Sequence, residues 1–130
     1  MFISLILIST IAASARAQRQ MENLGRGLIA VVRPDRKVYL SWRLLGTDAD
    51  NIAFNVYRTT TGGNPIKLND NPILTSTNFI DDDPPLAKGA THCVRPILSG
   101  HKADPSAPFA LPPNAPERQY LEIPLTTPRP

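Results

Sequence analysis

The sequence predicts an all-β fold: a small antiparallel β-sandwich followed by a proline-rich C-terminal tail. Short runs in which apolar and polar residues alternate recur about every ten residues, as they do in sandwich domains. No helical period appears after the apolar N-terminal stretch. The chain has 130 residues, 42% hydrophobic and 19% charged, which suits one small globular domain better than a disordered segment.

The N-terminal stretch predicts a secretory signal peptide over residues 1–17. Residues 1–13 are almost wholly apolar yet too few to span a bilayer, and they lead into Ala15-Arg16-Ala17, a small-x-small cleavage site. Cleavage after Ala17 would release a secreted, extracellular protein that begins at Gln18 and does not contact the membrane. The alternative is an uncleaved membrane anchor, because the segment has little positive charge at its start.

The first predicted strands lie within residues 28–58. LIAVVR, residues 28–33, ends at a Pro-Asp-Arg turn. In VYLSWRLL, residues 38–45, alternate residues are apolar, which is the period of a half-buried strand. Polar residues 46–51 then form a loop to a further strand in AFNVYR, residues 53–58. The side chains expected on the buried face of the second strand are Val38, Leu40, Trp42 and Leu44.

The remaining strands are predicted within residues 59–100. TTTGGNP, residues 59–65, is turn-like because its glycines can adopt positive φ. THCVRPIL, residues 91–98, is the strongest later strand and ends in a turn at Gly100. Weaker candidates are residues 66–68, 73–76 and 78–80. The residues expected to share one core are Leu40, Trp42, Phe54, Val56 and Val94.

Composition divides the chain after residue 104. Eight of the 14 prolines lie in residues 105–130, which predicts a stiff linker rather than part of a core. The run YLEIPL, residues 120–125, predicts one short strand within that linker. The expected organisation is therefore a signal peptide at 1–17, a β-sandwich at 18–104 and a proline-rich linker at 105–130.

Charge and motifs exclude several classes of function. The formal net charge is +3, but the basic residues are scattered and form no run that could follow phosphates, so we reject nucleic-acid binding. Cys93 is the only cysteine, which excludes an internal disulfide, and nothing near it in sequence favours a reactive thiolate. The chain contains no CxxC, no HExxH and no glycine-rich phosphate loop.

Three polar positions invite a functional interpretation. Asp81-Asp82-Asp83 could bind calcium, but we favour a strand end with solvated charges, because no EF-hand spacing is present. His92 and His101 have no evident carboxylate partner, and we interpret each as a packing or surface residue.

Aromatic residues could form a sugar-stacking platform. Trp42 and Tyr57 are candidates, but Trp42 shares the apolar face of its strand and is expected in the core. Tyr39 and Tyr57 are better candidates for exposed aromatics. No pair among the 11 acidic residues is singled out by its spacing for glycoside hydrolysis. We therefore predict no catalytic, cofactor-binding or metal-binding residue in this chain.

Five segments carry a resemblance to a known family: QMENLGRGLIAV, VYLSWRLLGTDADNIAFNVYR, STNFIDDD, CVRPIL and YLEIPL. In order and spacing, over nearly all of residues 20–125, they resemble the N-terminal β-sheet domain of bacterial rhamnogalacturonan I lyases, which are secreted polysaccharide lyases. LSW followed by NVYR also resembles fibronectin type III modules, so the resemblance implies a fibronectin type III or immunoglobulin-like sandwich. His92 departs from the pattern, because a tyrosine is expected there.

The resemblance implies that this chain has no activity of its own. In the family, YLxIPL leads into a large β-propeller that binds calcium and holds the cleft where rhamnogalacturonan I is cut by β-elimination. Only residues 126–130 come after that segment here, whereas a propeller needs several four-stranded blades. We expect the non-catalytic front domain of a rhamnogalacturonan lyase, from a truncated or split reading frame or as a solitary module. It would meet pectic polysaccharide through the full-length enzyme, with a propeller in cis or in trans, and hold no cofactor itself.

A second hypothesis is a stand-alone extracellular module that binds carbohydrate or protein. Such a module needs an exposed aromatic or polar platform on one sheet face. Exposure of Tyr39 or Tyr57 beside Arg43 or Arg58 would favour this hypothesis, and burial of all the aromatic residues would argue against it.

Overall fold

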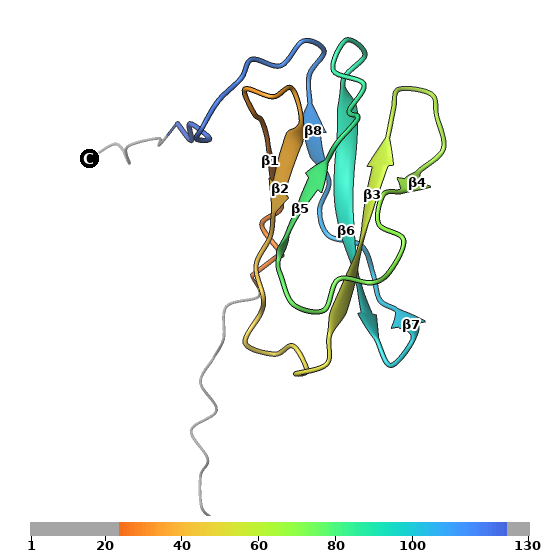
Figure 1. Cartoon of the computed structure of the whole chain (residues 1–130). Coiled ribbons are helices and arrows are strands. Elements are labelled where there is room, and N and C mark those ends of the chain that lie inside the picture. Colours follow the sequence, from red (N-terminus) through yellow and green to blue (C-terminus); the bar gives the residue numbers. More distant parts are fainter. Residues whose placement is uncertain (1–23, 125–130) are drawn as a thin grey trace, which may run out of the picture.

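Two antiparallel β-sheets pack face to face in the computed structural model, which describes residues 24–124 (Figure 1). The predicted signal peptide at 1–17 and residues 125–130 lie outside the described residues. Within residues 24–124, one sheet has three strands and the other has five. The predicted all-β sandwich is confirmed. Among the described residues, no helix is long and apolar enough to span a membrane.

The smaller sheet contains β1 (Ile29–Val32), β2 (Val38–Ser41) and β5 (Asn78–Asp81). The larger sheet contains β3 (Ala53–Thr59), β4 (Ile66–Lys67), β6 (Ala90–Leu98), β7 (His101–Lys102) and β8 (Phe109–Leu111). The strand order is β1-β2-β5 in the smaller sheet and β4-β3-β6-β7 in the larger one, with β8 also paired to β6. Burial alternates along β1, β2 and β6, so each presents one face to the other sheet.

The core lies between the sheets and contains the five residues that the sequence predicts. Leu40, Phe54, Val56, Val94 and Trp42 are all buried, and Trp42, the most accessible, is only 4% exposed. The Trp42 and Phe54 rings meet edge to face, with centroids 5.4 Å apart and planes at 64°. This is a favoured geometry for aromatic pairs, and it joins the end of β2 to the opposite sheet.

The strand that contains Tyr39 ends earlier than predicted. Leu44, expected on its buried face, is 61% exposed, because the chain leaves the smaller sheet after Ser41. The Arg43 backbone N–H instead donates to the Arg26 carbonyl at 2.7 Å. Residues 42–52 then cross to β3 in the other sheet, so β2 and β3 do not pair with each other.

The weaker strand candidates have mixed outcomes. Residues 66–67 form β4 and residues 78–81 form β5, as predicted. Residues 73–76 do not form a strand, and only Ile73 pairs, in an isolated antiparallel bridge with Phe54. Within 120–124 there is likewise no strand, and Leu125, the last residue of that predicted run, lies outside the described residues.

The sequence predicts a linker outside the core after residue 104. This prediction is wrong for the part of that segment that contains β8. Ala90 to His92 of β6 pair with β8, and Phe109 and Leu111 pack against the core. Further along, the Arg118 N–H donates to the Val32 carbonyl at 2.9 Å. Proline lacks the N–H that a central strand needs, but Pro108 and Pro112 flank β8 rather than interrupt it. Because of the high proline content, this short strand was not predicted from the sequence.

Gly89 shows how closely the segment after β8 approaches the loop before β6. Its φ is +71°, and a Cβ placed there would lie 2.7 Å from the Leu111 carbonyl oxygen and 2.9 Å from the Pro113 nitrogen. Both the backbone angle and the lack of space require glycine. The β5–β6 loop and the proline-rich segment are thus packed as parts of one domain.

Candidate functional site

A buried hydrogen bond between His92 and Asp81 joins the two sheets. His92 lies on β6 and is fully buried, and its Nε2 is 3.1 Å from Asp81 Oδ2 at the end of β5. Asp81 points inward because its ladder partner Val38 does. His92 is a packing residue, one of the two roles expected from the sequence, but it does have a carboxylate partner. The expectation of a solvated carboxylate at Asp81 is wrong, because Asp81 is buried.

Arg58 of β3 completes this polar cluster, which we call the inter-sheet cluster: Arg58, Asp81 and His92. Its Nη1 donates to Asp81 Oδ1 at 2.6 Å and to the Asp83 carbonyl at 2.7 Å. Burial opposes ionisation of Asp81, but the hydrogen bonds from His92 and Arg58 outweigh it and hold the pKa of that carboxyl below its usual range. Arg58, considered for an exposed platform on the sequence alone, is therefore an internal ion-pair partner.

The inter-sheet cluster resembles part of a catalytic acid–base system but cannot act as one. A general base must come within hydrogen-bond reach of the proton that it removes. His92 has no accessible surface, and its Nδ1 has no hydrogen-bond partner among the described residues. The cluster's geometry instead fixes β5 against β3 and β6 and holds the start of the β5–β6 loop through Asp83.

A second ion pair lies near the other end of the core. The Arg26 guanidinium binds both carboxylate oxygens of Asp48, and its carbon lies 5.1 Å from the centre of the Phe54 ring. The hydrogen bond from Arg26 holds the pKa of Asp48 below its usual range, against the opposing effect of burial. Because the two residues are 22 positions apart, sequence reasoning did not pair them.

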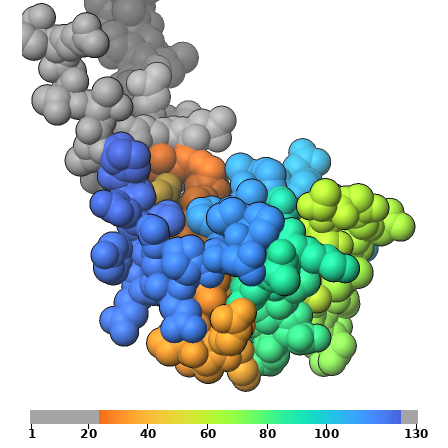
Figure 2. All heavy atoms as spheres, turned by 90° about the horizontal axis from the view of Figure 1, so that it is seen from above, coloured from red at the N-terminus to blue at the C-terminus, as the bar shows by residue number. Residues whose placement is uncertain are grey.

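A surface cleft of about 550 Å³ opens at the end of the sandwich that carries the β1–β2 turn. Figure 2 looks down on this end, and the orange β1–β2 turn and the green β5–β6 loop lie close together there. The cleft is lined by Asp35, Arg36, Thr60 and residues 82–88. Lys37 donates to Asp82 at 2.6 Å and so ties the turn to the loop.

The aspartate triplet does not act as a unit. The Asp81 carboxylate binds Arg58 and His92, whereas Asp82 binds Lys37. Within residues 24–124, no group of three or more His, Cys, Asp or Glu side chains is placed to hold a metal ion. The triplet thus supplies one internal and one surface ion pair.

The aromatic candidates do not form a common platform. Tyr39 lies on β2 of the smaller sheet and Tyr57 on β3 of the larger sheet, and both are half-buried. The Arg95 guanidinium lies 5.9 Å from the centre of the Tyr57 ring. Trp42, as predicted, is core. Tyr39 and Tyr57 therefore cannot form a single sugar-stacking platform on one sheet face.

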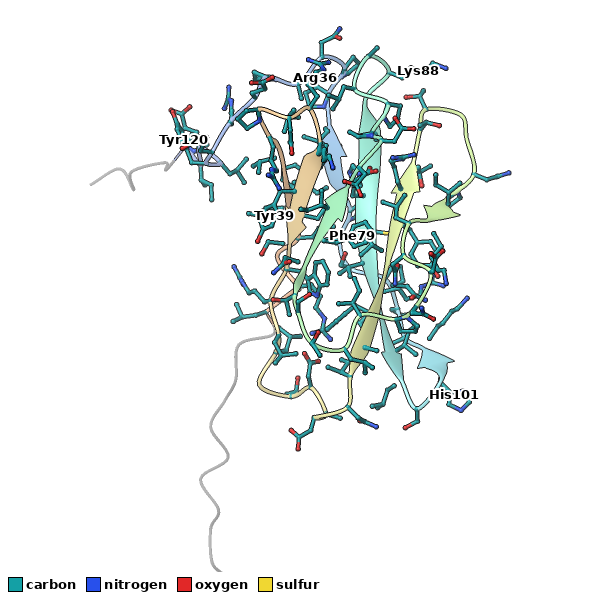
Figure 3. All side chains as sticks on the ribbon, in the orientation of Figure 1. Arg36, Tyr39, Phe79, Lys88, His101 and Tyr120 are labelled. Atoms are coloured by element: carbon teal, nitrogen blue, oxygen red, sulfur yellow. The ribbon has the colours of Figure 1, made fainter. Side chains whose placement is uncertain are left out.

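His101 and Cys93, also considered from the sequence, belong neither to the inter-sheet cluster nor to the surface cleft. His101 is exposed in β7, at the opposite end of the sandwich from Arg36 (Figure 3). Cys93 is half-buried on β6, and its burial raises the pKa of the thiol, against a smaller opposing effect of Arg95. A raised thiol pKa disfavours the reactive thiolate.

The strand order and the packing of the sheets define the class first: this is an Fn3-like β-sandwich. The crystal structure of an Fn3-like protein from Clostridium thermocellum matches it with a TM-score of 0.55 and 24% sequence identity, over 76% of this chain and 93% of that chain. At that identity the likeness shows the fold alone.

The sequence comparison narrows the class to a family. The family described as "Rhamnogalacturonan I lyases beta-sheet domain" matches residues 19–111, and the chain therefore belongs to it. The match ends at Leu111, the last residue of β8, so it spans the strands of both sheets.

Two curated relatives come from Bacillus subtilis (strain 168). The rhamnogalacturonan endolyase YesW is 43% identical over 84 residues, which are 65% of this chain and 12% of that protein. The rhamnogalacturonan exolyase YesX is 46% identical over 66 residues, which are 51% of this chain and 10% of that protein. The matched region is thus a small part of either relative.

Proposed function

We propose that this chain supplies the non-catalytic β-sheet domain of a secreted rhamnogalacturonan lyase. The observation that carries the proposal is the family match over residues 19–111, which coincides with the sandwich through β8. The reaction of the whole enzyme would be β-elimination at galacturonate in rhamnogalacturonan I. By the family resemblance, the cleft and the calcium sites belong to a β-propeller that works with this domain in cis or in trans.

The chemistry of β-elimination supports a non-catalytic role. The reaction needs a base at the C5 proton, a group that neutralises the galacturonate carboxylate, and several sugars held in register away from water. The inter-sheet cluster contains the buried histidine and aspartate of the described residues, and both side chains are enclosed between the sheets. His92 and Asp81 can stabilise the domain and cannot reach a polysaccharide.

A domain exchange tests whether the chain has this role. Residues 24–124 would replace the matching segment of the YesW endolyase, and the chimera would be assayed on rhamnogalacturonan I with calcium. We expect a folded chimera that retains most of the parent's activity. The control chimera carries the Fn3-like protein of Clostridium thermocellum at the same place. A chimera of this chain that folds, but is no more active than that control, would argue against equivalence of the domains.

Secretion has its own test. Expression of the full chain in a secreting bacterial host should give an extracellular product whose mass corresponds to a start at Gln18. Recovery of the uncleaved chain from the membrane fraction would instead support an N-terminal anchor.

A further inference from the structure

We propose that the cleft at the β1–β2 end of the sandwich binds a carboxylate-bearing saccharide, with Arg36 and Lys88 as the groups that contact the carboxylate. The proposal rests on the proposed function only in its choice of a uronate of the pectic chain as the ligand. It places the saccharide contact in the loops at one end of the sandwich rather than on a sheet face.

Two cations without a partner among the described residues line the cleft. Arg36 belongs to the β1–β2 turn and Lys88 to the β5–β6 loop, and both line the cleft. Figure 3 shows them at the same end of the molecule. Within residues 24–124, neither side chain makes a hydrogen bond or an ion pair, whereas the nearby Arg33, Lys37 and Arg58 all do. A carboxylate can be bound by two such cations, and an arginine can hold it through two parallel hydrogen bonds.

Two of the three acidic residues that line the cleft are paired with cations. Asp35 is paired with Arg33 at 3.3 Å, and Asp82 is paired with Lys37 at 2.6 Å, so much of their charge is compensated. The Asp83 carboxylate and the Thr60 hydroxyl remain as acceptors for sugar hydroxyl groups. Cations for a carboxylate, together with acceptors for hydroxyls, fit a uronate better than a neutral sugar or a simple anion.

The walls of the cleft are fixed before any ligand arrives. Arg58 holds the Asp83 carbonyl at 2.7 Å, and the Asn114 N–H donates to the Leu86 carbonyl at 2.7 Å. Pro84-Pro85 restrict the loop between these contacts. Arg36 has a φ of +63°, and its N–H donates to the Arg33 carbonyl at 2.9 Å, which sets the turn that carries its side chain. Preorganised walls reduce the ordering cost of binding.

The test is an NMR titration of the purified chain without its predicted signal peptide. The probes are oligosaccharides of the rhamnogalacturonan I backbone, homogalacturonan oligosaccharides, a neutral galactan, and polyglutamate as an anion that is not a sugar. We expect amide shifts at residues 35–37 and 82–88 with both uronate probes, and no comparable shifts with the galactan or polyglutamate. Response to only one uronate probe would show which pectic chain the cleft prefers and would still support the proposal.

Matched variants locate the contact. Arg36→Gln and Lys88→Gln should each weaken uronate binding about tenfold, the loss of roughly one charge-assisted hydrogen bond at an exposed site. Lys102→Gln removes a cation in β7, at the opposite end of the sandwich, and should leave binding unchanged. Thermal unfolding of each variant shows that it is folded. No saturable binding, equal shifts with polyglutamate, or equal binding by all three variants would overturn the proposal.

The tests of uronate binding and of the proposed function can fail independently of each other. An active domain-exchange chimera whose cleft binds no uronate would overturn this inference alone. Binding in the cleft together with an inactive, folded chimera would overturn the proposed function alone.

Discussion

His92 Nε2 lies 3.1 Å from Asp81 Oδ2, and this hydrogen bond connects β6 of the larger sheet to β5 of the smaller one. The family resemblance leads one to expect a tyrosine at position 92. The imidazole here is fully buried and uses the carboxylate as its partner, with Arg58 on the other carboxylate oxygen. A polar connection between sheets therefore occupies a place where an aromatic ring is expected, and its loss should destabilise the domain.

Substitution of Asp81 measures the contribution of the inter-sheet cluster. Asp81→Asn removes the charge that compensates Arg58 and should cost about 3–5 kcal/mol of unfolding free energy, as when one partner of a buried ion pair is removed. Urea denaturation is the measurement. Asp82→Asn is the control, because Asp82 pairs with Lys37 at the surface and its side chain is 72% exposed. If both variants are equally stable, the cluster does not hold the sheets together.

Acid should destabilise the domain through Asp81 and Asp48. Both carboxyls have a pKa below the usual value in the folded state, so the unfolded state takes up protons first as the pH falls. Their stabilising contribution is complete above the unfolded pKa of about 3.9 and is lost as the pH falls through the lower folded values. Urea midpoints measured from pH 5 downward should fall steadily, and Asp81→Asn should reduce the slope. A midpoint that stays constant below pH 4 would contradict the assignment.

The edge-to-face pair of Trp42 and Phe54 should dominate the core. Trp42→Ala should cost about 3–5 kcal/mol, because it removes a large buried ring and leaves a cavity. The matched variant Leu44→Ala should change stability by less than about 0.5 kcal/mol, since Leu44 is at the surface. A loss below about 1 kcal/mol for Trp42→Ala, in a denaturant titration, would show that Trp42 is not core.

Two glycines with the same backbone conformation test whether the proline-rich segment belongs to the domain. Gly62 and Gly89 have φ values of +73° and +71°, but only a Cβ at Gly89 would meet neighbouring backbone. Gly62→Ala should cost about 1–2 kcal/mol from the left-handed conformation alone. Gly89→Ala should cost more, because the segment from Leu111 to Pro113 must also move. Equal losses in thermal or urea unfolding would mean that this segment is not packed against the loop.

The sequence predicted the features that repeat locally and missed those that depend on distant partners. Alternation along 38–42, 53–56 and 91–97 was enough to place the sandwich core, since one buried face imposes a period of two. The same alternation misled at Leu44, because a loop between sheets can continue the pattern by chance. The strand β8 was missed because of the high proline content around it, and its three residues pair with β6, which is distant in sequence.

The polar features could not have been inferred from one sequence. Asp81 and His92 are 11 residues apart, and Arg58 lies 23 residues before Asp81, so neither spacing suggests a contact. The pairing of β3 with β6 places Arg58 beside His92, and the packing of the two sheets brings Asp81 of β5 against them. The cleft likewise combines three loops that are separate in sequence, and no single motif marks it.

The absorbance of unsaturated products tests the central claim, that this domain does not cleave rhamnogalacturonan, most directly. β-Elimination leaves a double bond that absorbs in the ultraviolet, so purified residues 18–130 can be incubated with rhamnogalacturonan I and calcium beside the YesW endolyase. We expect steady product formation by YesW and none by this chain, because its buried histidine and aspartate cannot reach a substrate. Steady product formation that survives repurification, and that is lost in the folded variant Arg36→Gln or Lys88→Gln, would contradict the claim.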